Sequence, residues 1–235
     1  MFALYLTLGM EGIYMVFRNQ ITWLQALIVI FVSTFITISI TLVRDLGNEN
    51  IIKWYNFDII LYSCIVAFLF LYKVSYCYLR DEWDVFALLR WRSYVLFILA
   101  ITLQFLISNW LLNIPLLSTW DLLTSPTAYY LDATGAQKVS FIIGMTLLAA
   151  IAEEAIFRGI ILKKLLTRFN LFISVCLSSL FFSIVHLPST FTDAFLSFLL
   201  GVLTASLYRL TRSLSISIIF HSTWNLFIIF YSNYL

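Results

Sequence analysis

Seven apolar stretches, each close to 20 residues long, dominate this sequence. An apolar run of about 20 residues crosses the hydrocarbon core of a bilayer as a helix. Hydrophobic residues make up 62% of the 235 positions, more than a soluble core of this size can bury. We therefore predict an all-α fold, a polytopic transmembrane helical bundle, with spans at 21–43, 57–79, 93–112, 138–162, 171–187, 191–208 and 214–232.

The first 17 residues form a further apolar stretch, interrupted by Gly9, Glu11 and Gly12. This stretch lacks a basic leading segment, so we do not expect a cleavable signal peptide. We expect either an eighth, short span or a helix at the membrane surface. The prediction is therefore a bundle of seven or eight spans.

Charge placement predicts the orientation of the bundle, because short cytoplasmic loops are enriched in lysine and arginine. The connection 113–137 and the turn after His186 contain neither residue. The basic connections alternate with these two along the chain, so we expect them to face the cytoplasm and the carboxyl terminus to face outside. The basic residues concerned are Arg80, Arg90, Arg92, Lys163, Lys164, Arg168, Arg209 and Arg212.

Two further inferences follow from charge and cysteine usage. A net charge of +2, without a long lysine or arginine block, makes nucleic acid an improbable partner. Cys64, Cys77 and Cys176 lie in predicted spans without disulfide or metal spacing, so we interpret them as small hydrophobic residues.

The stretch 80–92, RDEWDVFALLRWR, carries acidic, basic and tryptophan residues and is predicted to be a cytoplasmic interfacial helix.

Charged residues inside the span 138–162 need a specific explanation. Glu153 and Glu154 lie about 15 Å, at helical rise, from the lysine pair that marks the cytoplasmic surface. A carboxylate at this depth costs about 3 kcal/mol on insertion scales, so it normally serves a function inside the protein. Arg158 follows Glu154 by four residues, and we expect the two to pair, the alternative being a purely structural ion pair for the whole cluster. Glu153 is left without a cationic partner in the adjacent turns and is available for proton transfer.

The only two histidines lie in later spans. Phe182 precedes His186 by four residues and should pack beside its ring, and Pro188 should end the helix there. Asn225 follows His221 by four residues, so one helix face presents an imidazole and an amide together. A lone histidine in a helix is more often a hydrogen-bonded core residue. Two histidines with an asparagine and a free glutamate are better explained by a shared site.

The predicted depths of these residues disagree. If the span 171–187 starts at the cytoplasmic surface, His186 lies about 22 Å deep, whereas Glu153 lies about 15 Å deep. Helix tilt, a late helix start or the opposite orientation of the bundle would each bring the two residues together.

These residue types suit peptide hydrolysis, which needs a base for water, a donor for the oxyanion and an acid for the leaving amine. Glu153 can act as the base, and a histidine with Asn225 can donate to the oxyanion. Zinc is the alternative, since His186, His221 and Glu153 form a common ligand set. The helical HExxH pattern is absent, so we expect metal-independent catalysis without a cofactor.

Three ordered motifs resemble those of the CAAX protease and bacteriocin-processing (CPBP, or Abi) family of intramembrane endopeptidases. EExxxR matches EEAIFR at 153–158, FxxxH matches FSIVH at 182–186, and HxxxN matches HSTWN at 221–225. The resemblance covers roughly 139–233, so we divide the chain into poorly defined amino-terminal helices, 1–137, and a catalytic four-helix core, 138–235. It implies that Glu153 activates water, that His186, His221 and Asn225 form the reaction centre, and that Glu154 and Arg158 support them.

The resemblance also implies a class of substrate and a location. The substrate would be a membrane-associated protein or peptide, cleaved either in processing of a prenylated CAAX tail or in maturation of a bacteriocin or pheromone. The location would be the lipid bilayer of a cell membrane, with the bacterial cytoplasmic membrane as our expectation. The main alternative is a bacteriocin-immunity or regulatory protein that binds without proteolysis. A proton-coupled transporter would usually show repeated halves, and we detect no repeat.

Overall fold

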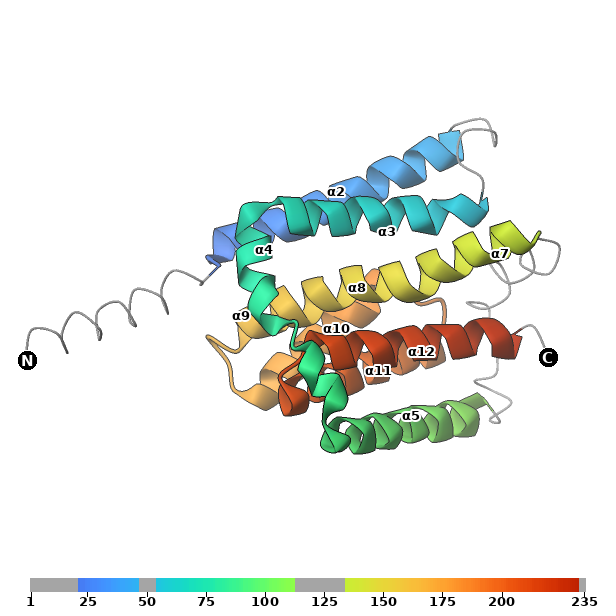
Figure 1. Ribbon diagram of the computed structural model, residues 1–235. Helices are drawn as coiled ribbons and strands as arrows, with labels where there is room; N and C mark the ends of the chain where they lie inside the picture. Colours follow the sequence, from blue (N-terminus) through green and yellow to red (C-terminus); the bar gives the residue numbers. More distant parts are fainter. Residues whose placement is uncertain (1–20, 47–53, 113–133, 233–235) are drawn as a thin grey trace, which may run out of the picture.

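The computed structural model of the protein describes residues 21–46, 54–112 and 134–232 (Figure 1). Every regular element in these ranges is a helix, so the predicted all-α fold is confirmed. The predictions for the first 17 residues and for most of the connection 113–137 lie outside the described residues.

The first half of the described chain contains three long helices and a bent connector. The elements are α2 (Trp23–Leu46), α3 (Trp54–Leu71), α4 (Lys73–Leu79), the 3₁₀ helices η1 (Arg80–Glu82) and η2 (Val85–Leu89), and α5 (Trp91–Leu112). The second half begins with one continuous helix, Gly135–Leu165, here called the central helix. Its parts are α7 (Gly135–Ile142), η3 (Ile143–Leu148), α8 (Ala149–Glu154), η4 (Ala155–Leu162) and α9 (Lys163–Leu165). Three helices follow: α10 (Leu171–Val185), α11 (Phe191–Thr211) and α12 (Leu214–Ser232).

Each predicted span corresponds to a helix, except that 57–79 covers the two helices α3 and α4, and the count of seven or eight membrane crossings is not confirmed. Among the described residues, four helices are long and apolar enough to cross a membrane: α2, α5, the central helix and α11. A fifth crossing is obtained if α3 and the helices after it count as one span. The run predicted at 57–79 is not straight, because the chain bends by 86° between Leu71 and Lys73. The helices α10 and α12 are apolar but shorter.

The interfacial helix predicted at 80–92 is wrong as a single element. Trp83 and Asp84 leave the helical region of backbone angles, which separates η1 from η2. The carbonyl of Asp84 instead accepts a hydrogen bond from Ser213 Oγ at 2.7 Å, which ties the connector to the turn before α12. The Trp83 ring packs against Phe70, with ring centroids 5.8 Å apart.

The long helices alternate in direction, so the basic connections gather at one end of the bundle, on the left in Figure 1. We call this the basic end. It includes α9 and the turn that leads into α10, which carry Lys163, Lys164 and Arg168. It also includes the last turn of α11 and the turn before α12, which carry Arg209 and Arg212. The opposite end, here called the far end, holds the start of α7 and the end of α12.

Close packing of α10 against α11 depends on Gly201. A Cβ added at this position would lie 2.9 Å from Ser179 Cβ and 3.0 Å from Ser179 Cα. These distances are too short for carbon atoms, so the two helices can approach this closely only with glycine at the contact.

We expect Gly201→Ala to lower the free energy of unfolding by about 1–3 kcal/mol, because the methyl group overpacks the contact between α10 and α11. Gly135→Ala is the matched control, since no atom lies within 4 Å of a Cβ added at the start of α7. The control should be neutral or slightly stabilising, because alanine favours the helix over glycine. Thermal unfolding in detergent measures both variants, and equal melting temperatures would contradict the packing argument.

Candidate active site

The two glutamates lie on the short α-helical turn α8, between two π-helical segments of the central helix, η3 and η4. Single π-helical turns inside α-helices occur frequently at functional sites, because they change the direction of side chains and free backbone carbonyls. Glu153 is half-buried and faces a cavity, whereas Glu154 is fully buried.

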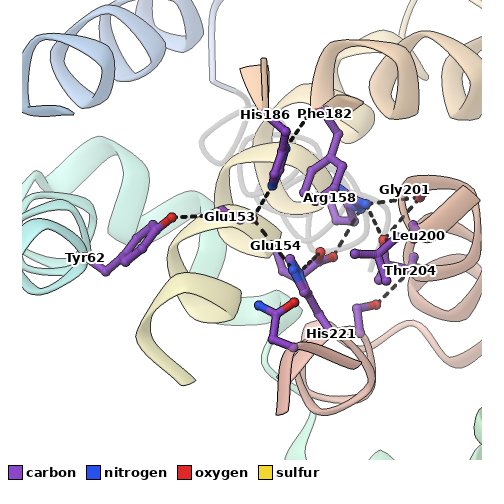
Figure 2. Close-up of polar contacts among 12 residues, drawn as sticks. Tyr62, Glu153, Glu154, Arg158, Phe182, His186, Leu200, Gly201, Thr204 and His221 are labelled. Carbon is purple, nitrogen blue, oxygen red and sulfur yellow. Dashed lines mark hydrogen bonds and ion pairs between the residues drawn. The ribbon is translucent and has the colours of Figure 1, made fainter. Parts of the chain in front are cut away.

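Arg158 pairs with Glu154 as the sequence predicts, with Arg158 Nε 3.1 Å from Glu154 Oε2 and both side chains fully buried. The guanidinium also donates to the backbone carbonyl of Gly201 at 3.1 Å and to the hydroxyl of Thr204. Its carbon lies 4.7 Å from the centre of the Phe182 ring. The positive charge is thus held by α11 on one side and by an aromatic face on another (Figure 2).

Glu154 does more than neutralise Arg158, because its other oxygen contacts His221. Glu154 Oε1 lies 2.9 Å from His221 Nδ1. A carboxylate paired with arginine only accepts hydrogen bonds, so Nδ1 of His221 carries the hydrogen. The Arg158–Glu154 pair therefore fixes the orientation and the tautomer of this imidazole, which lies on α12.

Glu153 lies where three helices other than its own converge (Figure 2). Its Oε1 accepts a hydrogen bond from the Tyr62 hydroxyl of α3 at 2.9 Å. Its Oε2 lies 3.5 Å from Nε2 of His186 and 3.7 Å from Nε2 of His221. Oε1 of Glu153 thus faces the phenol of Tyr62, and Oε2 faces the two imidazoles.

The ring of His186 reaches Glu153 because it turns back along its own helix. Nδ1 of His186 lies 2.7 Å from the carbonyl oxygen of Phe182, one turn earlier, and the two rings are 4.3 Å apart. Helical side chains point towards the amino terminus, so the His186 ring lies nearer the basic end than its own backbone does. This direction lessens the depth difference between His186 and Glu153 in the sequence-based estimate. The predicted packing of Phe182 beside His186 is confirmed.

Both imidazoles direct an unprotonated Nε2 at Glu153 when they are neutral. A carbonyl oxygen cannot donate, so His186 carries its hydrogen on Nδ1, as His221 does. Two nitrogen lone pairs and Oε2 of Glu153 then face one another. Such a cluster of acceptors favours a proton or a donor such as water between them.

Asn225 lines the same cavity and holds the central helix in place. Its side-chain nitrogen donates to the backbone carbonyl of Met145 in η3, at 3.0 Å. An asparagine amide has two N–H groups, so one remains for a further acceptor. The structure therefore brings Asn225 to the site, but with half of its donor capacity already used.

A cavity of about 210 Å³ opens beside Glu153. Its polar wall consists of His186, His221, Asn225 and Tyr62 together with Asp193 and Ser197 of α11. The remaining wall is mainly apolar and comes from the central helix, α11 and α12. It includes Phe141, Met145, Leu196, Leu200, Trp224, Ile228 and Ile229.

Sequence reasoning missed Tyr62, which lies 91 positions before its partner Glu153. Its only signal is a hydroxyl inside a predicted span, and three of the 13 tyrosines of the sequence lie later in the same span. The position of α3 against the central helix, where Gly144 lies against the backbone of Asp58 and Ile59, brings Tyr62 to the site.

We expect Tyr62→Phe to lower kcat by about 10-fold with little change in KM, because one hydrogen bond to a charged group contributes about 1.5 kcal/mol. Tyr76→Phe is the matched control, since Tyr76 is partly exposed and lies outside the cavity. Steady-state cleavage kinetics on both variants test the assignment. A Tyr62→Phe variant as active as the control would remove Tyr62 from the site.

Comparison with known families gives the class of protein that part of this chain resembles. Residues 135–227 match the family of type II CAAX prenyl endopeptidase Rce1-like proteins. This segment is an Rce1-like domain. Comparison of the chain with curated proteins and with solved structures finds no match.

The Rce1-like domain contains Glu153 and all other residues that the motifs predict, and Tyr62 lies outside it. The match of residues 135–227 to this family supports an intramembrane protease, and the apolar helices agree with a multi-pass membrane protein. The resemblance inferred from the three motifs is therefore confirmed at the level of the family.

The fit of a metal to the Rce1-like domain depends on how the donor groups are arranged. Histidines that bind zinc usually donate their other ring N–H to an acceptor, as His186 and His221 do. However, among the residues that the structure describes, no group of three or more histidine, cysteine, aspartate or glutamate side chains is arranged to hold a metal ion. His186, His221 and Glu153 remain the residues that would hold zinc, and metal dependence stays a prediction that the effect of a chelator on cleavage tests.

Proposed function

We propose that this protein is an intramembrane endopeptidase in which Glu153 activates the attacking water. The observation that carries the proposal is the convergence of two imidazole Nε2 atoms on Glu153 Oε2, at 3.5 and 3.7 Å, beside a cavity. A water bound between these atoms would donate one hydrogen to the carboxylate and the other to an imidazole. Both contacts increase the nucleophilic character of its oxygen.

The reaction then proceeds by ordinary acid–base chemistry. The water oxygen bonds to the carbonyl carbon of the substrate while Glu153 Oε2 takes a proton, and the carbonyl π electrons move to its oxygen. The remaining N–H of Asn225 donates to this oxyanion. An imidazole adds a second donor only when Nε2 is protonated. Collapse of the intermediate breaks the C–N bond, and protonated Glu153 transfers its proton to the leaving amine.

Tyr62, Glu154 and Arg158 act as positioning residues in this proposal. Tyr62 occupies Oε1 of Glu153, so that Oε2 remains the oxygen that faces the imidazoles. Arg158 holds Glu154, and Glu154 holds His221 in the tautomer that leaves Nε2 free. A site held rigidly by buried neighbours needs little rearrangement during the reaction.

The substrate in this proposal is an apolar segment of a membrane-associated protein or peptide, because most of the cavity wall is apolar. A CAAX-type tail and a bacteriocin or pheromone precursor both fit this description. The protein would act in a cell membrane, with the bacterial cytoplasmic membrane as the proposed location.

The test is cleavage of a panel of peptides by the purified full-length protein in lipid, with products identified by mass spectrometry. The panel contains prenylated and unprenylated CAAX tails and apolar precursor peptides. Cleavage that is indifferent to a chelator supports glutamate catalysis, whereas loss that zinc reverses would assign the site to a metalloenzyme. No cleavage of any peptide would favour the immunity or binding function instead.

A further inference from the structure

The cavity extends from Glu153 in one direction only along the central helix. Its other lining residues on this helix are Phe141, Met145 and Ala149, at successive intervals of four residues before Glu153. Phe141 lies 12 positions, or about 18 Å at helical rise, towards the far end. No described residue of this helix beyond Glu153, towards Lys163, lines the cavity.

The antiparallel helices α11 and α12 show the same asymmetry. On α11, which begins nearer the far end, the lining residues run from Asp193 to Leu200 and stop there. On α12, which ends at the far end, they run from His221 to Ile229 and do not include the first turns. The two helices run in opposite directions, yet along each of them the lining residues lie between the level of the glutamates and the far end.

Tight packing fills the space between the site and the basic end. Arg158 and Leu162 are fully buried there, and so is Leu214 at the start of α12. A Cβ added at Gly159 would overlap with Leu79 Cδ2, so the end of α4 packs closely against the central helix at this level. The described residues therefore leave the far end as the direction of access to Glu153.

The charges at the two ends of the bundle indicate which side of the membrane the far end faces. The basic end carries Lys163, Lys164 and Arg168 together with Arg209 and Arg212, which precede α12. The described far end carries only Arg44 and Lys138 among lysines and arginines. Short basic loops face the cytoplasm. The far end, and with it the approach to the site, then faces away from the cytoplasm.

We propose that the site receives its substrate from the side opposite the cytoplasm, so that the substrate is an apolar segment of an exported or surface peptide. This inference rests on the proposed endopeptidase function and selects one of its two substrate classes. A cytoplasmic CAAX tail would have to approach through the packed layer of Arg158, Leu162 and Leu214.

The test uses the full-length protein with a protease-removable tag at its carboxyl terminus, which follows α12 at the far end. Sealed lipid vesicles are prepared with two different ratios of the two orientations, and the fraction of accessible tags gives the fraction of far ends outside. A membrane-impermeant quenched peptide, selected from those cleaved in detergent, is added outside. Before the vesicles are permeabilised, the rate of peptide cleavage should be proportional to the fraction of molecules whose far end lies outside. A rate that follows the basic ends would overturn the inference.

A second measurement separates this inference from the proposed function. Ser197→Cys, in a chain without its native cysteines, adds a thiol to the cavity wall on α11 without changing a predicted catalytic residue. An impermeant maleimide should label this thiol only from the side of the carboxyl-terminal tag, and labelling from the basic end would overturn the inference. Absence of cleavage even in detergent would overturn the endopeptidase and the substrate class, whereas the labelling result would still decide the direction of access.

The orientation in cells requires a separate comparison. A carboxyl-terminal alkaline phosphatase fusion, which is active only outside the cytoplasm, should be active, and a fluorescent protein that folds only in the cytoplasm should be dark at the same position. The reverse pattern would place the cavity on the cytoplasmic side and overturn the assignment to exported peptides.

Discussion

Glu153→Gln is expected to lower kcat/KM by about 10²–10⁴-fold, the contribution of a general base that also returns the proton. Glutamine keeps the size of the side chain and an oxygen that accepts from Tyr62, but it cannot take a proton from water. The change should therefore remove catalysis while leaving the fold intact. Peptide cleavage kinetics and thermal unfolding of the same preparation measure the two effects separately.

Asp81→Asn is the control for this variant, because it replaces an exposed carboxylate by an amide in the connector after α4. An exposed ion pair such as Arg80–Asp81 contributes little to stability. We expect unchanged kinetics for Asp81→Asn. A Glu153→Gln protein that retained more than about a tenth of the wild-type kcat/KM would exclude Glu153 as the general base.

Arg158→Met is expected to lower the free energy of unfolding by about 3–5 kcal/mol, the cost of leaving one charge of a buried pair without its partner. Glu154 would then remain in a fully buried position with only His221 to neutralise it. The loss should appear as a large fall in the melting temperature in detergent. Arg90→Met is the matched control, because Arg90 pairs with Asp84 at the surface and its removal should cost at most about 1 kcal/mol.

The double variant Glu154→Gln, Arg158→Met separates stability from activity. Without either charge, most of the lost stability should return, because no unpaired ion remains in the core. Activity should stay low, since His221 loses the charged acceptor that fixes its tautomer. A double variant as unstable as Arg158→Met alone would mean that packing around Phe182 and Thr204, rather than charge, explains the loss.

The motif residues could be found from the sequence because intramembrane charge is costly and rare. Glu154 and Arg158 have helical spacing, so their ion pair follows from the sequence alone. The contact between Glu154 and His221 does not, because it joins residues 67 positions apart on helices whose packing the sequence does not specify.

Tyr62 shows the same limit more clearly. Hydropathy places it in a span, but helix packing, not local pattern, selects the tyrosine that faces Glu153. The depth estimate for His186 used the helix rise alone, and the sequence does not show that its ring turns back towards Phe182. The 86° bend after Leu71 and the π-helical segments beside α8 likewise have no distinctive residue pattern.

The most direct test of the central claim is cleavage of a single peptide in water enriched with ¹⁸O, using wild-type protein and Glu153→Gln purified in lipid. Hydrolysis adds one water to the two products, so the new carboxyl group should carry the heavy isotope with the wild-type protein. The variant should give no product above the background while showing the same melting temperature. Binding of the peptide without any labelled product, or equal product from both proteins, would contradict a protease that depends on Glu153.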